Sequence, residues 1–264
     1  MRMRAERERF CMKTLYLKAD ETIAPYVIFS GDPWRVEVLA KYLDNAEHVA
    51  FSREFNTYTG EYKGMKVTVT STGIGAPSAA IAMEEMYACG MKVAVRMGTV
   101  MSLRDDLLGQ FMIPSAAMRE EGTSKTYVPE SYPAVADIGL INCMNQTVKA
   151  HGVRYCNGIN CTMDGFYSQM KESRLSKERG IDIPNTYARL KKLGIVGIDM
   201  ESSCILTLAS LMGVRACIVT MVTVLENLKD ELKGQARTDA EDLLCRVVLE
   251  GLYKLHQEEA QQDE

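Results

Sequence analysis

The chain repeatedly passes from a short apolar run, through a turn that contains glycine or proline, into a helical pattern. Residues 26–29 form the first apolar run, and apolar side chains at helical spacing follow over residues 36–43. Residues 66–70 lead in the same way into a helix over 77–89, with Pro77 at its start and Gly90 after its end. This alternation is typical of an α/β fold, in which helices cover both faces of a mainly parallel or mixed sheet.

The same alternation continues toward the C-terminus, and the chain is expected to fold as a single domain. Its 264 residues contain no low-complexity segment and no linker. The domain is predicted over 15–256, after a charged extension over 1–14 that is a solvated helix or a frayed tail, and before a disordered polar tail over 257–264. The remaining predicted elements are strands over 93–97, 110–113, 153–159 and 215–224, and helices over 137–150, 200–212 and 238–255.

The composition argues against several classes of protein. The chain is 47% hydrophobic and 25% charged, as expected for an ordinary globular enzyme. Its net charge of −4 argues against a general nucleic-acid binder, whose affinity depends on a basic surface. No apolar stretch approaches the roughly 20 residues of a membrane span, and the charged N-terminus lacks the apolar core of a signal peptide. We therefore expect a cytoplasmic protein that binds neither nucleic acid nor membranes.

The cysteines and histidines do not form a metal-binding pattern. The eight cysteines are scattered, mostly inside apolar runs, without a Cys-x-x-Cys pair, and the three histidines lie far apart in the sequence. Zinc sites normally show closer ligand spacing. We predict reduced, buried thiols and no zinc or transition metal.

Three arginines stand at glycine-bearing turns or near strand-like runs: Arg35 in SGDPWR, Arg53 in SREF and Arg96 in VRMGT. Open α/β sheets bind ligands at the carboxyl ends of their strands. A guanidinium matches phosphate or carboxylate oxygens, and glycine lets backbone N–H groups approach the same anion. A solvated surface charge is the alternative for any one arginine, but an unpaired charge is costly beside the apolar run before Arg96. The sequence therefore predicts a site for a compact, multiply charged anion.

Five motifs along the chain together indicate a family. They are GDPxR at 31–35, SREF at 52–55, STGIGxPS at 71–78, RxGT at 96–99 and DMES at 199–202. In their order and spacing, from about residue 15 to about residue 255, the chain resembles the nucleoside phosphorylase family. The resemblance is to the trimeric or hexameric branch of uridine phosphorylase and bacterial-type purine nucleoside phosphorylase, and is closest to uridine phosphorylase. It implies pentosyl transfer from a nucleoside to inorganic phosphate, the co-substrate, with no other cofactor.

The resemblance also implies a phosphate site. In the family, phosphate is held by the counterparts of Gly31, Arg35, Arg96 and Thr99, while the counterpart of Arg53 reaches in from the neighbouring subunit. The three arginines are the catalytic groups, because they orient the attacking phosphate and place its charge against the cationic sugar. A borrowed arginine requires at least a dimer, and a hexamer built from such dimers is expected.

The implied ribose contacts come from three residues. Glu201 accepts hydrogen bonds from the 2′- and 3′-hydroxyls, and Met200 packs on the sugar. Tyr16 replaces the histidine that usually contacts the 5′-hydroxyl. Each residue has a structural alternative: Met200 as a core methionine, Glu201 as a charge that complements a helix dipole, and Tyr16 as a core aromatic.

The base contacts favour the uridine branch. Leu225 stands where the purine enzymes carry the aspartate that protonates the purine. Uridine phosphorylases carry Phe-Tyr-x-Gly-Gln-x-Arg, and this chain has FYSQMK, one residue shorter, from Phe166 to Lys171. Phe166 is predicted to stack on the base; with a gap after residue 168, Gln169 and Lys171 read its edge, and without the gap neither aligns. Lysine does not reproduce the bidentate contacts of arginine. Glu226 replaces a second arginine behind the uracil site, and its charge suggests an ion pair with Lys171.

Two further departures concern the rest of the site. Met101, after Val100, replaces a small residue and could crowd the phosphate side or the base side. Glu54, Ile74 and Ser78 match positions that ligate a cation between subunits in some uridine phosphorylases, so a cation at the subunit interface is predicted. The sequence as a whole predicts phosphorolysis of a nucleoside, with uridine preferred, to free base and ribose 1-phosphate. The alternatives are a purine phosphorylase with an altered base pocket, a hydrolytic nucleosidase, and a non-catalytic nucleoside-binding paralogue.

Overall fold

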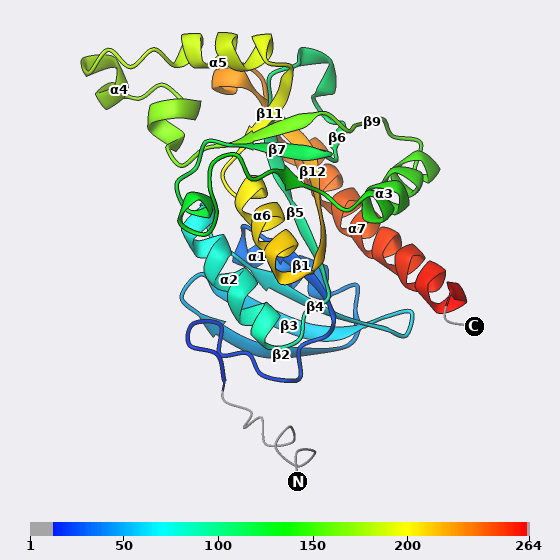
Figure 1. The fold of residues 1–264 in the computed structure, drawn as a ribbon. Coiled ribbons are helices and arrows are strands. Elements are labelled where there is room, and N and C mark those ends of the chain that lie inside the picture. The colour runs from blue at the N-terminus through cyan, green and yellow to red at the C-terminus, as the bar shows by residue number, and fades with distance from the viewer. Residues whose placement is uncertain (1–12, 263–264) are drawn as a thin grey trace.

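The computed structural model describes residues 13–262, and residues 1–12 and 263–264 lie outside that range. The described residues form a twelve-stranded mixed sheet with helices on both faces, which confirms the predicted α/β fold class (Figure 1). The strands are β1 (Tyr26–Ser30), β2 (Asp44–Ser52), β3 (Phe55–Tyr62), β4 (Met65–Ser71), β5 (Val93–Ser102), β6 (Phe111–Met112), β7 (Ala116–Arg119), β8 (Ala134–Val135), β9 (Tyr155–Cys156), β10 (Ile159–Thr162), β11 (Ile195–Asp199) and β12 (Arg215–Leu225). The α-helices are α1 (Pro33–Ala40), α2 (Ala76–Ala88), α3 (Ile138–Ala150), α4 (Arg174–Glu178), α5 (Ile183–Lys192), α6 (Ser202–Met212) and α7 (Gly234–Gln262).

Strand β5 lies at the centre of the sheet, where it belongs to both halves. One of its edges pairs with β12 in parallel along nearly the whole strand. The other edge pairs first with β1, up to Ser30 opposite Met97, and then with the antiparallel β11, from Ile198 opposite Met101. Strands β1 and β11 therefore run toward each other along one edge of β5. Their carboxyl ends both lie beside residues 98–100 of β5. This meeting point positions the site described below.

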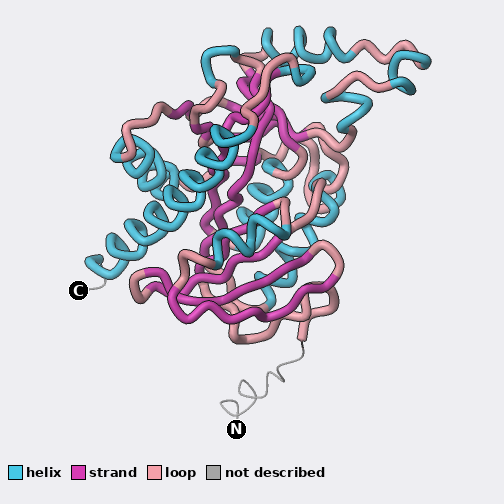
Figure 2. Tube along the Cα trace, turned by 180° about the vertical axis from the view of Figure 1, so that it is seen from behind, coloured by secondary structure: helices cyan, strands magenta, loops and turns pink. Residues whose placement is uncertain are grey.

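The helices form two layers around this sheet. Helices α2 and α6 pack against each other on one face, and α3 and α7 pack against each other on the opposite face (Figures 1 and 2). Helix α1 packs on β1, β3 and β4. The largest fully buried side chains of the core include Phe29, Phe55 and Phe111, which come from three different strands. Burial of apolar area between these layers is the main stabilising contribution to the fold.

The turns after β1 and β4 show why the sequence motifs fold as they do. Asp32 caps α1, since its side chain accepts a hydrogen bond from the Trp34 backbone N–H (2.9 Å), and Pro33 occupies the first helical position. Gly75 precedes α2 with φ of 98°, a conformation that favours glycine. Both turns therefore place the N-terminal end of a helix directly after the carboxyl end of a strand, α1 after β1 and α2 after β4.

Several elements differ from the sequence-based expectation. The strands of the β2–β3 hairpin and β11 were not predicted, because β2 is a largely exposed polar edge strand and the apolar run of β11 is interrupted by Gly197. Residues 257–262 were expected to be disordered but are the last turns of α7. They are fixed by Glu259, which accepts a hydrogen bond from the Tyr26 hydroxyl and pairs with Arg215, both at 2.5 Å. The predicted N-terminal extension lies almost wholly outside the described residues.

Buried thiols are found inside the fold, as the sequence suggested. Cys143, Cys161, Cys204, Cys217 and Cys245 are all buried. Burial raises the pKa of the Cys143 thiol to about 11 and that of Cys161 to about 12, so these groups are protonated at neutral pH. Within residues 13–262, no helix is both long enough and apolar enough to cross a membrane.

Candidate active site

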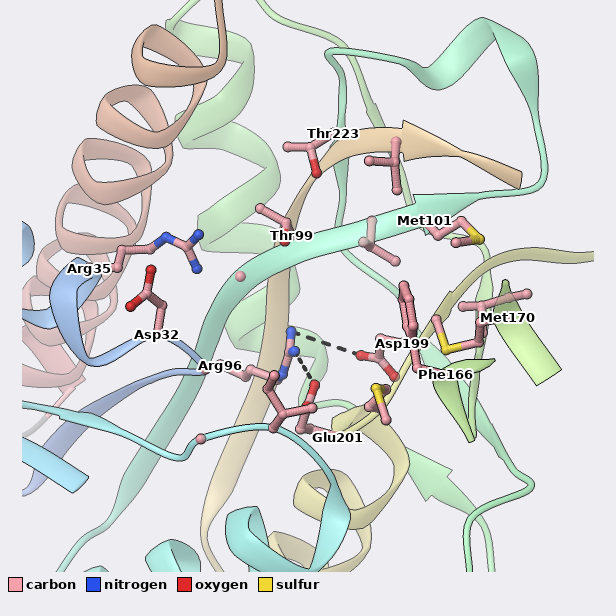
Figure 3. Close-up of a pocket in the computed structure, with 18 of the residues that line it drawn as sticks. Asp32, Arg35, Arg96, Thr99, Met101, Phe166, Met170, Asp199, Glu201 and Thr223 are labelled. Carbon is pink, nitrogen blue, oxygen red and sulfur yellow. Dashed lines mark hydrogen bonds and ion pairs between the residues drawn. The ribbon is translucent and has the colours of Figure 1, made fainter. Parts of the chain in front are cut away.

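A cavity of about 1000 Å³ opens where β1 and β11 meet along β5. Figure 3 shows Arg35 and Asp32 on one side of it, Phe166 and Met170 on the other, and Arg96 and Glu201 between them. We call the first side, together with the central Arg96, the anion end; its lining residues are Gly31, Arg35, Arg96, Gly98 and Thr99. We call the second side the apolar end, with lining residues Met101, Phe166, Met170, Val224 and Leu228.

Arg96 is the buried cation at the centre of the cavity. It lies on β5 opposite Phe29 of β1 and is only 5% exposed. Its guanidinium pairs with the Glu201 carboxylate, and its Nη1 lies 3.9 Å from Asp199 Oδ2 (Figure 3). Gly98 makes room for this group, because a Cβ at that position would lie 2.7 Å from Arg96 Nη1. The Arg-x-Gly spacing of the motif therefore has a direct steric cause.

Two carboxylates at the end of β11 set the charge of Arg96. Burial favours the neutral form of a guanidinium, but Glu201 and Asp199 hold the pKa of Arg96 above its ordinary value. Burial raises the pKa of the Asp199 carboxyl, against the opposing charge of Arg96. Asp199 also accepts a hydrogen bond from the Thr162 hydroxyl (2.8 Å) and another from Ser202. Asp199 thus holds the start of α6, while Glu201 faces the cavity.

Glu201 is held in place by a backbone group from a distant motif. The Gly75 N–H donates a hydrogen bond of 2.8 Å to Glu201 Oε1, while Oε2 pairs with Arg96. Glu201 is the N-cap residue of α6, yet its side chain makes no capping hydrogen bond. Its carboxylate is therefore directed toward the cavity and Arg96, and it does not serve as a helix cap.

The anion end has donor groups without partners among the described residues. Arg35 extends from the first turns of α1, and its Nη2 donates to Glu241 Oε1 at 3.0 Å. The Nε of Arg35, and the Nε and Nη1 of Arg96, are buried and make no hydrogen bond there. Buried N–H groups of this kind are costly unless a ligand or water accepts from them. Their position at the anion end indicates an oxyanion as the ligand.

Of the remaining residues predicted to bind phosphate or ribose, three line the cavity and two do not. Gly31, Thr99 and Met200 line the cavity, as the motifs suggested. Arg53 and Tyr16 do not line the cavity of the same chain, and the Arg53 guanidinium lies over the Tyr16 ring, 5.3 Å from its centroid. Their roles stay predictions, and the expected supply of Arg53 by a neighbouring subunit is compatible with this position.

The predicted base residues divide into two groups. Phe166 lines the apolar end of the cavity, whereas Gln169, Lys171 and Glu226 do not line it. Gln169 Oε1 accepts from its own Gly165 N–H at 2.8 Å. Base reading by Gln169 would require this side chain to turn.

The expected ion pair between Lys171 and Glu226 is not present. Lys171 Nζ donates to the backbone oxygen of Asn227 at 3.2 Å. Glu226 pairs instead with Lys191 at 2.6 Å and with Lys229 at 3.3 Å. The prediction was wrong because Lys191 of α5 and Lys229 of the turn after β12 lie close to Glu226 in the fold. The sequence alone does not show this proximity for α5. The roles of Lys171 and Glu226 toward a base stay predictions.

The predicted cation position is the junction of the β2–β3 turn and α2. Glu54 Oε1 accepts a hydrogen bond from the Ser78 hydroxyl at 2.9 Å, and Ile74 is 77% exposed nearby in sequence. Among residues 13–262, no group of three or more His, Cys, Asp or Glu is placed to hold a metal. A cation here would have to complete its ligands from elsewhere, and it stays a prediction.

Some cavity residues were not predicted from the sequence. Thr223 of β12 and Arg237 of α7 line the cavity, and Gly75 holds Glu201. Gly75 stood inside a recognised motif, so its contact could have been anticipated from the need of a buried carboxylate for donors. Thr223 and Arg237 carry no local signal, because their position depends on the packing of β12 and α7.

The fold and the cavity together define a class of protein: an α/β protein whose cavity places two arginines beside a buried carboxylate. The model of the Phosphorylase superfamily matches residues 25–252. The chain belongs to this superfamily, and it is a nucleoside phosphorylase of the pentosyltransferase type that resembles uridine phosphorylase. Nucleoside and phosphate are the substrates that the family implies.

Individual relatives agree with this placement. A uridine phosphorylase of Thermococcus kodakarensis is 39% identical over 76% of this chain and 73% of its own length. A guanosine phosphorylase of Halorubrum lacusprofundi is 32% identical over 86% of this chain and 92% of its own. The crystal structure of uridine phosphorylase from Vibrio fischeri superposes with a TM-score of 0.81 at 31% identity, covering 93% of this chain and 99% of that one.

Proposed function

We propose that the protein catalyses the phosphorolysis of uridine to uracil and ribose 1-phosphate. The observation that carries the proposal is one cavity with three parts. Arg35 and Arg96, whose buried N–H groups are partly unpartnered among the described residues, lie at the anion end, the Glu201 carboxylate lies beside Arg96, and an apolar surface lies at the other end. Phosphate would occupy the anion end, the ribose hydroxyls would lie beside Glu201, and the flat face of the base would lie against the apolar end. Uridine phosphorylases among the similar proteins support uridine as the nucleoside.

In this proposal the anion end binds and orients the nucleophile. Arg35, Arg96 and Thr99 would hold phosphate, with the Gly31 backbone close by, so that one phosphate oxygen lies below the anomeric carbon. That oxygen forms the C1′–O bond while the C1′–N1 bond breaks. The bonding electron pair leaves on the base nitrogen, and the proton carried by phosphate or water ends on the base. The phosphate charge stabilises the oxocarbenium-like sugar, so no covalent enzyme intermediate is needed.

The ribose would lie between the two ends. Glu201 would exchange its contact with Arg96 for the 2′- and 3′-hydroxyls, which frees the guanidinium for phosphate. Met200 lines the cavity beside Glu201 and would pack on the sugar. Substrate binding would therefore replace an internal ion pair by contacts to both substrates.

The base would occupy the apolar end against Phe166, which provides a stacking surface. Gln169, Lys171 and Glu226 are retained as proposed polar contacts of the base, each requiring a side-chain movement from its present partner. Leu225 is buried and offers no proton donor for a purine, which favours a pyrimidine.

Arg53 would complete the phosphate site of a neighbouring subunit, and Tyr16 would accompany it toward the ribose. The two side chains form one unit, because the guanidinium lies over the ring at 5.3 Å. Leu15 and Phe51, close to them in sequence, are exposed apolar side chains that a second copy could cover. A homo-oligomer with a dimer as its smallest active unit follows from this model, and the resemblance to the trimeric or hexameric branch of the family favours a hexamer built from such dimers.

A panel of nucleosides assayed with and without phosphate tests the proposal. We expect release of uracil from uridine that depends on phosphate and is also supported by arsenate. Base release at the same rate in phosphate-free buffer would instead indicate a hydrolase. Nucleoside binding in calorimetry without any turnover would select the non-catalytic paralogue.

A purine-specific phosphorylase is the second candidate. The similarity to a guanosine phosphorylase favours it. Inosine and guanosine in the same panel decide between the two: a higher kcat/KM for either purine nucleoside than for uridine would reject the pyrimidine preference.

A further inference from the structure

The anion end contains a third arginine that none of the motifs includes. Arg237 lies near the start of α7 and lines the cavity together with Arg35. Its Nε donates to Glu241 Oε1 at 2.7 Å, within the same helix. The same oxygen accepts from Arg35 Nη2 at 3.0 Å, from a helix about two hundred residues earlier in the chain. One carboxylate oxygen thus lies between two guanidinium groups at the edge of the cavity.

The partners of this carboxylate keep it charged. Burial would raise the pKa of Glu241, but hydrogen bonding from Arg237 and the charges of Arg35 and Arg237 lower it below its ordinary value. The side chain of Arg35 is 10% exposed, and those of Glu241 and Arg237 are about one-third exposed. The Arg35 side chain is therefore nearly enclosed, while the Glu241 and Arg237 side chains are partly open to solvent and have room to move.

We propose that Arg237 is an additional phosphate-binding residue. Glu241 acts as a built-in counter-ion, which holds Arg35 and Arg237 before phosphate binds and competes with phosphate for them. This inference rests on the proposed phosphorolysis. Arg35 would keep one donor on Glu241 and offer its unpartnered Nε to phosphate, while Arg237 transfers a donor from the carboxylate to the phosphate oxygens.

The competition has a measurable consequence. A phosphate that enters the anion end must approach a carboxylate of the same sign, which opposes binding. Arg237 compensates for part of this repulsion. The balance between the two residues would set the phosphate affinity without any contact to the nucleoside, so their variants should alter the constants for phosphate alone.

The test uses three full-length variants: R237Q, E241Q and the control R246Q. Arg246 pairs with Asp242 on the same helix at 3.0 Å, also four residues apart, but does not line the cavity. Phosphate binding is measured by calorimetry with inorganic phosphate alone. The KM values for phosphate and uridine are measured separately, and thermal unfolding checks that each variant is folded.

We expect R237Q to raise the Kd and KM for phosphate about tenfold, the effect of losing one charge-assisted hydrogen bond, while the KM for uridine changes less than twofold. E241Q is expected to lower the phosphate Kd by about three- to fivefold, because the amide can still accept a hydrogen bond but carries no charge. R246Q should match the unaltered protein.

An R237Q variant with unchanged phosphate constants would overturn the role of Arg237. An E241Q variant that binds phosphate no better, or more weakly, would overturn the counter-ion role and leave Glu241 as a positioning residue only. The KM values presuppose an active parent protein, whereas the calorimetric Kd for phosphate does not. If the parent protein released no base in the presence of phosphate, the proposed phosphorolysis would be wrong. Calorimetry with phosphate would still test whether Arg237 binds phosphate.

Discussion

The two ends of the cavity differ in how their side chains are held. At the anion end, Arg35 and Arg96 each have a carboxylate partner, and glycines bring the backbone close. At the apolar end, Met101, Phe166, Met170 and Val224 belong to one packed hydrophobic cluster. Gln169 and Lys171, which were predicted to read a base, make hydrogen bonds elsewhere. The anion end is thus preorganised by charge, whereas the apolar end offers shape and a stacking surface.

This difference suggests a division of labour. Preorganised charge contributes most where charge develops in the reaction, so the anion end should dominate the rate. An apolar surface distinguishes bases weakly, since one methyl group changes affinity only modestly. Variants at the two ends should therefore differ by orders of magnitude, which the following predictions test from the largest effect to the smallest.

The largest effect is expected for R96Q. The change removes the central cation and leaves Glu201 and Asp199 buried without it, so kcat/KM should fall about a thousandfold or more. The free energy of unfolding should fall by about 3–5 kcal/mol, the usual cost of breaking a buried pair. Steady-state kinetics and denaturant unfolding measure the two effects.

A double variant separates catalysis from stability at this position. R96Q/E201Q should recover part of the lost stability, because only the Asp199 carboxyl is then left without the cation, but none of the activity. R104Q is the surface control, since Arg104 pairs with Asp106 in solvent and does not line the cavity. An R96Q protein that kept activity within tenfold of the parent would contradict a central role of this guanidinium.

The next effect concerns Arg53, whose position outside its own cavity predicts action on a neighbour. R53Q and R35Q are each expected to lose about a hundredfold in kcat/KM, from the loss of charge-assisted contacts to phosphate. Mixed and reassembled, the two variants should regain about a quarter of the parent activity, because half of random dimers carry both variants and each of these has one intact site.

No regain of activity on mixing, with assembly verified by gel filtration, would place Arg53 outside the shared site. A fully active monomer in the parent protein would have the same consequence. Mixing R35Q with R96Q serves as the control: both changes affect the chain's own cavity, so no mixed dimer contains an intact site.

The sequence was informative about the anion end for a physical reason. The SGDPWR and VRMGT motifs place arginine within a few residues of the turn that directs it, and Gly98 is required by the guanidinium beside it. Local sequence therefore specifies most of this geometry. The alternation of elements predicted the fold class. The strand order, which brings the carboxyl ends of β1 and β11 together along β5, could not be predicted from any local segment of the sequence.

The apolar end was harder to predict because its contacts are made between distant segments. Lys171 bonds to Asn227, and Glu226 to Lys191, through a packing of loops that no single motif encodes. The link of Arg35 to Glu241 depends likewise on the approach of α7 to α1. Charge sign alone suggested a Lys171–Glu226 pair, but several cations compete for one carboxylate on a crowded surface.

Phe166 should show an intermediate effect at the apolar end. F166A removes the stacking surface, and stacking of a base on an aromatic ring contributes about 1–3 kcal/mol. We expect the KM for uridine to rise about tenfold with the KM for phosphate unchanged, the opposite pattern to R237Q. S168A is the control in the same helical turn, since Ser168 is exposed and does not line the cavity. Equal effects of the two variants would indicate loss of the local helical turn in place of stacking.

The smallest predicted effect is a preference for a methylated base. Met101, Met170 and Val224 line the apolar end, so a 5-methyl group on the pyrimidine would be buried against them. Burial of one such group contributes about 0.8 kcal/mol, which corresponds to a three- to fourfold higher kcat/KM for 5-methyluridine than for uridine. M101A should reduce this ratio toward one by removing the packing surface, while V38A, a change at an exposed position of α1, should leave it unaltered. A ratio well below one in the parent protein would mean that polar side chains, with Gln169 and Lys171 the first to examine, turn into this end when a nucleoside binds and occupy the space assigned to the methyl group.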